Sequence, residues 1–147
     1  FGTQESRWVN HGEVQEPQLL EINGLKIGMQ TCYDLRFPEV SRMLVDAGAD
    51  VLALPAEWVP GPLKEFHWTT LLQARAIENT VYVVAADQSA PTGSGHSSIV
   101  DPMGISIATI GEEVGIAHAE LKQDRISSAR ATNPALAVRR FRVVSND

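Results

Sequence analysis

Apolar and polar positions follow one another along the chain in runs that predict a sheet flanked by helices. Short apolar runs between turn residues are typical of strands, and apolar residues repeated every three to four positions are typical of a helix that buries one face. The predicted strands are 19–22, 25–31, 50–54, 80–86, 97–100, 106–110 and 114–121, and the predicted helices are 38–47, 66–79 and 122–132. Residues 1–18 are polar and irregular, which predicts a loop.

The order of these elements predicts an α/β fold. Asn23 and Gly24 form the dipeptide that two-residue hairpins prefer, so the first two strands should pair antiparallel. Residues 25–86 then read strand, helix, strand, helix, strand, which calls for parallel strands whose crossover helices cover the sheet. The later strands are separated by short turns and should complete the same sheet in antiparallel pairs.

A single cysteine, Cys32, lies where the 25–31 strand turns toward the following helix. A helix N-terminus favours the thiolate, and its free N–H groups can hold a developing oxyanion. A buried structural thiol is the alternative, but the polar residues Tyr33, Asp34 and Arg36 directly after it argue against an inert apolar pocket. The position predicts a nucleophile.

Composition excludes several other classes of function. The 147 residues are 44% hydrophobic, enough for one domain with a core, and the net charge of −6 disfavours nucleic acid or an anionic membrane as partner. No apolar run is long enough to span a membrane. One cysteine allows no internal disulfide and suits the cytoplasm, where we expect the protein. The four histidines match no metal-binding spacing, so no metal or cofactor is expected.

Four segments together resemble the nitrilase superfamily of carbon–nitrogen hydrolases. They are CYDLRFPE at 32–39, LPAEW at 54–58, ARAIEN at 74–79 and DPMG at 101–104, in the family's order and spacing. The closest resemblance is to its amidase-like branch, which includes omega-amidases and related Nit proteins. The resemblance implies that residues 1–147 are a single partial domain, the C-terminal half of a four-layer α-β-β-α sandwich, whose N-terminal half precedes Phe1.

The resemblance also implies roles for residues inside and outside the chain. Cys32 matches the family's nucleophile and Glu5 its second active-site glutamate, whereas the general-base Glu and the oxyanion Lys belong upstream of Phe1. Lys26 is not expected to replace that Lys, because six residues of strand place it about 20 Å from the thiol. Lys64 is expected to be a solvated charge in the Pro-rich loop. We therefore expect residues 1–147 alone to be inactive.

Two further pairs are candidates at the strand ends and on the second helix. Glu57 and Trp58 directly follow a strand, where α/β sheets collect ligand-binding loops, and both are candidates for substrate binding, with plain packing equally open for Trp58. Arg75 and Glu78 lie three apart on a helix and should form a buried pair that supports the wall of the site. Tyr33 should contribute its backbone N–H to the oxyanion.

Asp34 and Arg36 are expected to lock the turn, by pairing with each other or with backbone. His67 leaves a Cys-His hydrolase open as a less favoured arrangement.

The leading function is hydrolysis of a non-peptide C–N bond in a small amide through a cysteine thioester, with release of ammonia or an amine. A non-catalytic binding or assembly module of the same fold is one alternative, and an acyltransferase that uses the same cysteine is another. The resemblance suggests a homodimer or a larger homo-oligomer. Residues 135–141 are apolar enough that we expect them to cross into a neighbouring subunit.

Overall fold

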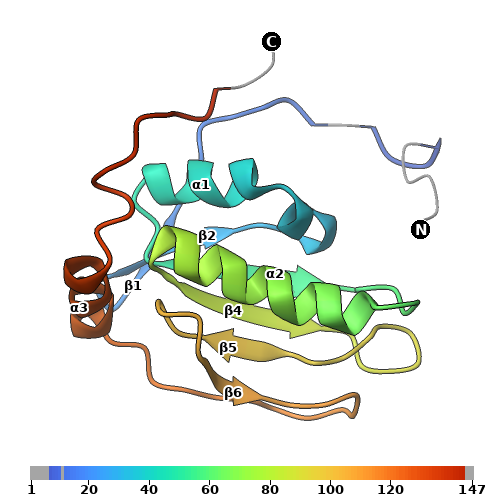
Figure 1. Cartoon of the computed structure of the whole chain (residues 1–147). Coiled ribbons are helices and arrows are strands. Elements are labelled where there is room, and N and C mark those ends of the chain that lie inside the picture. The colour runs from blue at the N-terminus through green and yellow to red at the C-terminus, as the bar shows by residue number, and fades with distance from the viewer. Residues whose placement is uncertain (1–6, 11, 145–147) are drawn as a thin grey trace.

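A computed structural model describes residues 7–10 and 12–144 of the chain and contains one mixed sheet (Figure 1). Its strands run in sequence order across the sheet, with β2, β3 and β4 parallel and the outer pairs antiparallel. The strands are β1 (Leu20–Ile22), β2 (Leu25–Met29), β3 (Val51–Ala56), β4 (Tyr82–Asp87), β5 (Ser98–Val100) and β6 (Ser106–Thr109), and the helices are η2 (Cys32–Arg36), α1 (Pro38–Asp46), α2 (Lys64–Asn79) and α3 (Gln123–Thr132). The α/β fold predicted from the sequence is confirmed.

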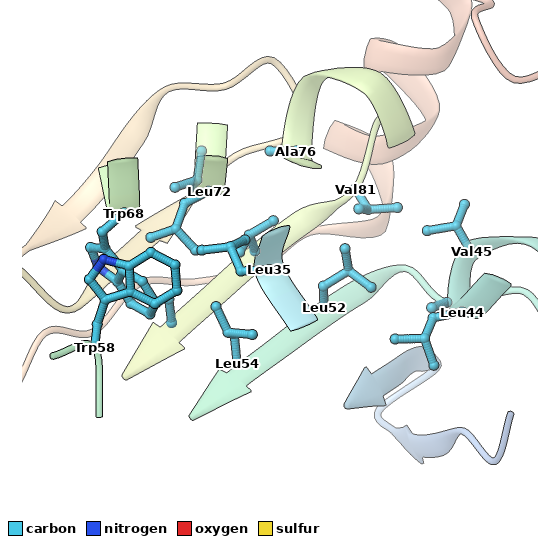
Figure 2. Packing of buried hydrophobic residues seen from close by; sticks show 14 residues of the cluster. Leu35, Leu44, Val45, Leu52, Leu54, Trp58, Trp68, Leu72, Ala76 and Val81 are labelled. Atoms are coloured by element: carbon cyan, nitrogen blue, oxygen red, sulfur yellow. The ribbon is translucent and has the colours of Figure 1, made fainter. Parts of the chain in front are cut away.

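Helices α1 and α2 cover one face of the sheet and enclose the main core (Figures 1 and 2). Alternate strand positions point to this face, including Leu52 and Leu54 on β3, both essentially unexposed. Trp58 and Trp68 close the core at the carboxyl ends of β3 and β4, with ring centroids 5.3 Å apart. The largest buried side chains therefore lie directly beneath the end of the sheet that carries Cys32.

The opposite face is covered only in part. Val51 and Tyr82 pack with Ile126 of α3 at the amino ends of the parallel strands. On the same face, β1 and β2 leave apolar side chains open, with Ile22 54% and Met29 56% exposed. We call this region the open face. A sheet in a folded domain normally buries an apolar face against another layer, so the open face marks where one is expected.

One predicted strand is absent, and several other elements begin or end one or two residues away from the sequence predictions. Residues 114–121 form no strand, because β6 ends the sheet among the described residues, and Val114 and Ile116 are exposed. The second strand ends at Met29 rather than residue 31, since η2 begins at Cys32. Helix α2 begins at Lys64 rather than residue 66. Among the residues described, no helix is long and apolar enough to cross a membrane.

Candidate active site

Cys32 begins η2 in a backbone conformation that few side chains adopt. Its φ is +46°, in the left-handed region, which costs a residue with a Cβ roughly 1–2 kcal/mol. The sequence predicted a helix directly behind the thiol; the structure has a five-residue 3₁₀ turn there, and α1 starts only at Pro38. Strain of this kind persists only where neighbouring contacts fix the backbone, and it is common at functional sites.

Hydrogen bonds hold the segment 31–37, which we call the Cys32 turn. The Thr31 N–H donates to the Asp34 carboxylate at 2.8 Å, and the Asp34 N–H donates back to the Thr31 carbonyl at 2.9 Å. Asp34 thus bonds to backbone, and no ion pair joins it to Arg36 among the described residues. Because Asp34 donates the first bond within η2, the N–H groups of Cys32 and Tyr33 precede the helical bonding pattern.

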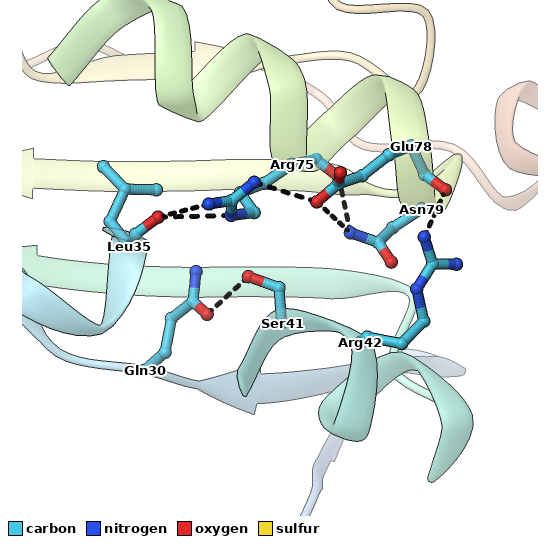
Figure 3. A network of polar contacts seen from close by, with 7 residues as sticks. All are labelled: Gln30, Leu35, Ser41, Arg42, Arg75, Glu78 and Asn79. Carbon is cyan, nitrogen blue, oxygen red and sulfur yellow. Dashed lines mark hydrogen bonds and ion pairs between the residues drawn. The ribbon is translucent and has the colours of Figure 1, made fainter. Parts of the chain in front are cut away.

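Arg75 anchors the Cys32 turn from below. Its guanidinium, buried beneath α2, donates two hydrogen bonds to the Leu35 carbonyl, at 3.2 and 2.8 Å, and pairs with Glu78 at 3.0 Å (Figure 3). Glu78 is about one-third exposed, and its carbonyl accepts a hydrogen bond from Arg42 of α1. Arg75 and Glu78 therefore lie behind the turn and support it, and the thiol itself faces another loop.

The thiol of Cys32 faces the loop that follows β3. It donates to the Glu57 carbonyl oxygen, with sulfur and oxygen 3.6 Å apart, while the Glu57 side chain is exposed. The next backbone N–H, of Trp58, donates to the Asp87 carboxylate at 2.6 Å. Asp87 ends β4 and also accepts a bond from the Ser94 hydroxyl. The carboxyl ends of β2, β3 and β4 thus converge on the thiol.

Trp58 is fully buried, and its ring is covered by charged as well as aromatic groups. The Arg36 guanidinium carbon lies 4.7 Å from the ring centroid, and the Lys64 ammonium nitrogen lies 4.5 Å from it. The indole N–H donates to the Lys64 carbonyl at 2.8 Å. Its position in the core supports packing, and a direct contact between Trp58 and substrate stays a prediction, as does one with Glu57.

Lys64 was expected to be solvated, and that expectation is wrong. It is 9% exposed, because α2 begins two residues earlier than predicted and places it against Trp58. Burial lowers the pKa of its ammonium and the Arg36 guanidinium lowers it further, while Cys32, Asp87 and Glu65 raise it. Lys64 therefore lies within electrostatic reach of the thiol, whereas Lys26 contacts the α1–β3 turn at the other end of the sheet.

Asp87 is the second group that the sequence analysis missed. Burial raises the pKa of its carboxyl group above the usual value, against the lowering effect of the hydrogen bonds from Trp58 and Ser94. A signal for it did exist, since Asp87 ends its strand as Glu57 follows the neighbouring one. Carboxyl ends of adjacent parallel strands meet at one edge.

The remaining predicted residues are placed as follows. Tyr33 is half-exposed beside the thiol, with its ring 5.8 Å from Phe37 and 5.4 Å from the Arg36 guanidinium carbon. Glu5 lies outside the described residues. Among the residues that the structure describes, His67 has no hydrogen bond to Cys32, and no three acidic, His or Cys side chains group as metal ligands do.

Comparison with known proteins agrees with this arrangement. The model of the carbon–nitrogen hydrolase family matches residues 2–131. The chain belongs to the carbon–nitrogen hydrolase family. It is 48% identical over 141 residues to protein YbeM of Escherichia coli strain K12, covering 96% of this chain and 75% of that protein. The deaminated glutathione amidase of Escherichia coli O157:H7 is also 48% identical over 141 residues, covering 96% of this chain and 53% of the enzyme.

Solved structures place this carbon–nitrogen hydrolase in the nitrilase superfamily. The crystal structure of Saccharomyces cerevisiae Nit3, a member of branch 10 of that superfamily, superposes with a TM-score of 0.83 at 32% identity. The match covers 93% of this chain and 51% of Nit3. The chain thus has the nitrilase fold and spans about half the length of Nit3 and of the amidase from Escherichia coli O157:H7.

Proposed function

We propose that this chain carries the nucleophile of an amidase that hydrolyses a non-peptide C–N bond in a small amide. Its relatives include enzymes named deaminated glutathione amidases, which supports an amide as substrate. We further propose that a preceding half supplies the general-base Glu and the oxyanion Lys, so that the complete protein is active and residues 1–147 alone are not. Cytoplasmic location remains our expectation.

The proposed reaction has two stages. The upstream Glu takes the proton of the Cys32 thiol, the thiolate attacks the amide carbonyl carbon, and the Tyr33 N–H together with the upstream Lys holds the oxyanion. The C–N bond then breaks, the leaving amine takes a proton from the upstream Glu, and a thioester on Cys32 remains. Water, deprotonated by the same Glu, attacks the thioester and releases the acid, which regenerates the thiolate. Glu5, by its resemblance to the family's second glutamate, would orient the Lys or the substrate.

The observation that carries the proposal is the strained position of Cys32 at the converging strand ends. Cys32 has a φ of +46° although it carries a side chain, and Asp34 and Arg75 hold this conformation. Strain of this kind supports a thiol that reacts with substrate rather than one with a structural role. The neighbouring Lys64 and Arg36 are positive groups that favour a thiolate. An inert structural cysteine needs neither feature.

Ammonia release from small amides by the full-length protein tests the proposal. We expect turnover of glutaramate by the wild type, none by Cys32→Ser or Cys32→Ala, and none by residues 1–147 expressed alone. Retained turnover in either Cys32 variant would place the nucleophile elsewhere. Turnover by residues 1–147 alone would favour the Cys-His arrangement with His67. Binding of amides by the full-length protein without any turnover would favour a non-catalytic module.

Hydroxylamine separates hydrolysis from acyl transfer. Hydroxylamine that attacks the thioester in place of water yields a hydroxamate instead of the acid. For a hydrolase we expect acid as the main product at low hydroxylamine concentration. Predominant hydroxamate under those conditions would favour the acyltransferase alternative.

We also propose that the protein assembles as a homodimer or a larger homo-oligomer. After Leu136 packs on the core and Arg139 pairs with Asp46 at 2.6 Å, the chain leaves Phe141 88% and Val144 81% exposed. Exposed apolar groups so close together favour burial against a neighbour. Sedimentation of the full-length protein as a strict monomer at micromolar concentration would contradict this. Dissociation on deleting residues 140–147 would support it.

A further inference from the structure

One peptide bond beside the thiol makes a polar contact on each of its two sides. The peptide that joins Glu57 to Trp58 has its carbonyl oxygen 3.6 Å from the Cys32 sulfur, and its N–H donates to the Asp87 carboxylate at 2.6 Å. This peptide is trans, so its C=O and N–H point in opposite directions and fixing one of them fixes the other. The Asp87 carboxylate therefore determines that the carbonyl side of the peptide faces the thiol.

Asp87 is itself fixed by contacts that do not involve the thiol. It ends β4 in register with Ala56, the last residue of β3, and the Gln88 N–H donates to the Ala56 carbonyl at 2.9 Å. The Asp87 N–H donates to the Ser97 hydroxyl at 3.0 Å, and the second carboxylate oxygen accepts from the Ser94 hydroxyl at 3.1 Å. The carboxylate thus belongs to the sheet, whereas the peptide that it holds belongs to the loop after β3.

A purely structural role for Asp87 is the alternative, in which it anchors the 88–97 loop through Ser94. The hydrogen bonds favour the other direction. The bond from the Trp58 N–H is shorter than the bond from Ser94, and short bonds to an ionised acceptor are strong. Burial raises the pKa of the Asp87 carboxyl, and among the hydrogen bonds that oppose this rise the one from Trp58 acts most strongly. The main contact of the carboxylate is therefore with the peptide beside Cys32.

The carbonyl that faces Cys32 can orient its side chain. A cysteine side chain has three staggered positions about χ1, and an acceptor placed at one of them favours that position. In the proposed reaction the sulfur first gives up its proton and then attacks the carbonyl carbon, and both steps require it in one place. A misplacement of about 1 Å can cost about a hundredfold in rate.

We propose that Asp87 is a positioning residue of the reaction: by holding the Trp58 N–H it turns the Glu57 carbonyl toward Cys32 and keeps the thiol oriented for attack. The inference rests on the proposed amidase function and adds to it a residue from the neighbouring strand. In this role Asp87 contacts neither the thiol nor the substrate, and it acts only through the peptide between them.

Variants of Asp87 and Ser94 test the inference in the full-length protein with glutaramate as substrate. Asp87→Leu and Asp87→Ala remove the acceptor of the Trp58 N–H, one filling its volume and the other adding no bulk. In each we expect kcat to fall at least about tenfold while KM changes less than about threefold. Asp87→Asn keeps an acceptor and should retain most of kcat.

Ser94→Ala is the matched control, because it removes the other hydrogen bond of the Asp87 carboxylate and leaves the bond from Trp58. It should retain most of kcat. An equal loss in Ser94→Ala would show that Asp87 only anchors its loop. An equal loss in Asp87→Asn would show that charge matters rather than the acceptor. Either result, or full kcat in Asp87→Ala, would overturn the inference.

An infrared measurement needs no turnover. The S–H stretching band moves to lower wavenumber when a thiol donates a hydrogen bond, and subtracting the spectrum of Cys32→Ser isolates the band of Cys32. In mildly acidic solution we expect Asp87→Ala to move this band to higher wavenumber, and Asp87→Asn and Ser94→Ala to leave it in place. An unmoved band in Asp87→Ala would contradict the inference. The expected movement, without ammonia release by the wild type, would support the link from Asp87 to the thiol and refute the amidase proposal, so the two failures are distinguishable.

Discussion

The two ends of the sheet treat buried charge in opposite ways. At the amino ends of β3 and β4, each acidic group meets a cation: Asp101 pairs with Arg125 and Asp50 with Arg130. At the carboxyl ends, the cations gather on Trp58 and the acid Asp87 bonds to neutral donors. The same fold therefore pairs acids with cations at one end of the sheet and places two cations against an aromatic ring at the other.

The pKa values follow the same division. Burial by itself raises the pKa of Asp101, but the Ile105 and Met103 N–H groups and the Arg125 guanidinium outweigh it and hold the pKa below its usual value. Burial wins at Asp87 and raises its pKa. Pairing of opposite charges stabilises a fold, whereas a buried acid with a raised pKa is typical of functional sites. The charge pairs at the amino end favour stability, and the raised pKa of Asp87 at the carboxyl end is consistent with the proposed active site there.

Removing the strained residue should cost activity without costing stability. We expect Cys32→Gly and Cys32→Ala to lose ammonia release by at least about a thousandfold in the full-length protein. Because glycine tolerates a φ of +46°, Cys32→Gly should be more stable than Cys32→Ala by about 1 kcal/mol. Urea unfolding measures this difference. A less stable glycine variant would mean that the turn is not strained.

Arg75 joins stability to activity, so its removal should affect both. In Arg75→Met the Leu35 carbonyl and the Glu78 carboxylate lose their buried partner, and the free energy of unfolding should fall by about 2–3 kcal/mol. We expect kcat/KM to fall at least tenfold as the Cys32 turn shifts. Arg130→Met, whose contact with Asp50 is long and partly exposed, is the control and should cost under about 1 kcal/mol. Full activity in Arg75→Met would separate the two roles.

At the amino end, loss of Arg125 should cost stability alone. Arg125→Met leaves the buried Asp101 carboxylate without its cation and should lower the free energy of unfolding by about 1–2 kcal/mol at pH 7. Since the pKa of Asp101 is lowered by folding, its ionised form stabilises the protein above about pH 4, and that contribution is lost as pH falls through the folded value. The gap between wild type and variant should narrow in acid.

Two results would contradict this assignment. One is a gap that stays constant between pH 7 and pH 3 in chemical unfolding. The other is a fall in kcat/KM in Arg125→Met. Arg140→Met removes an exposed arginine and should change neither property.

Asp87 should show the opposite pH dependence and the smallest effect. Folding raises its pKa, so its ionised form disfavours the fold, and stability is lost as pH rises from about 4 through the folded value. Asp87→Asn keeps an oxygen for the Trp58 N–H and removes the charge. Relative to wild type, its free energy of unfolding should be higher at pH 7 than at pH 3 by under about 1 kcal/mol. Glu113→Gln is the exposed control, and a change of the opposite sign would reverse the assignment.

Local patterns in the sequence predict the central strands well, because the strand–helix–strand order makes each apolar run pair with the next one in a parallel sheet. Strands β3 and β4 lie where the apolar runs predict them. Residues 114–121 show why pattern alone fails: the alternation is present, yet this segment pairs with no strand within the described part of the chain. Whether a segment at the edge of a sheet forms a strand depends on tertiary contacts with residues far away in the sequence.

The sequence predicts the site residues that are marked by their position along the chain. It misses those whose position depends on tertiary packing. Cys32 is marked by its place between a strand and a polar turn, and Arg75 and Glu78 by helical spacing. Lys64 follows a loop with two prolines, Pro60 and Pro62, and a left-handed residue, Leu63 at φ +60°, directly precedes its helix. Its burial then depends on Trp58, a contact that no spacing rule indicates.

Oxidation of a methionine on the open face can report whether a preceding half of the protein covers that face. Met29 lies bare there on β2, whereas Met43 is partly covered on α1. Dilute peroxide converts an accessible thioether to the sulfoxide and reacts slowly with a shielded one. If a preceding half of the protein lies over the open face, Met29 becomes oxidised in residues 1–147 alone and is spared in the full-length protein. The mass of the tryptic peptide that contains Met29 then reports how much of a preparation has both halves joined.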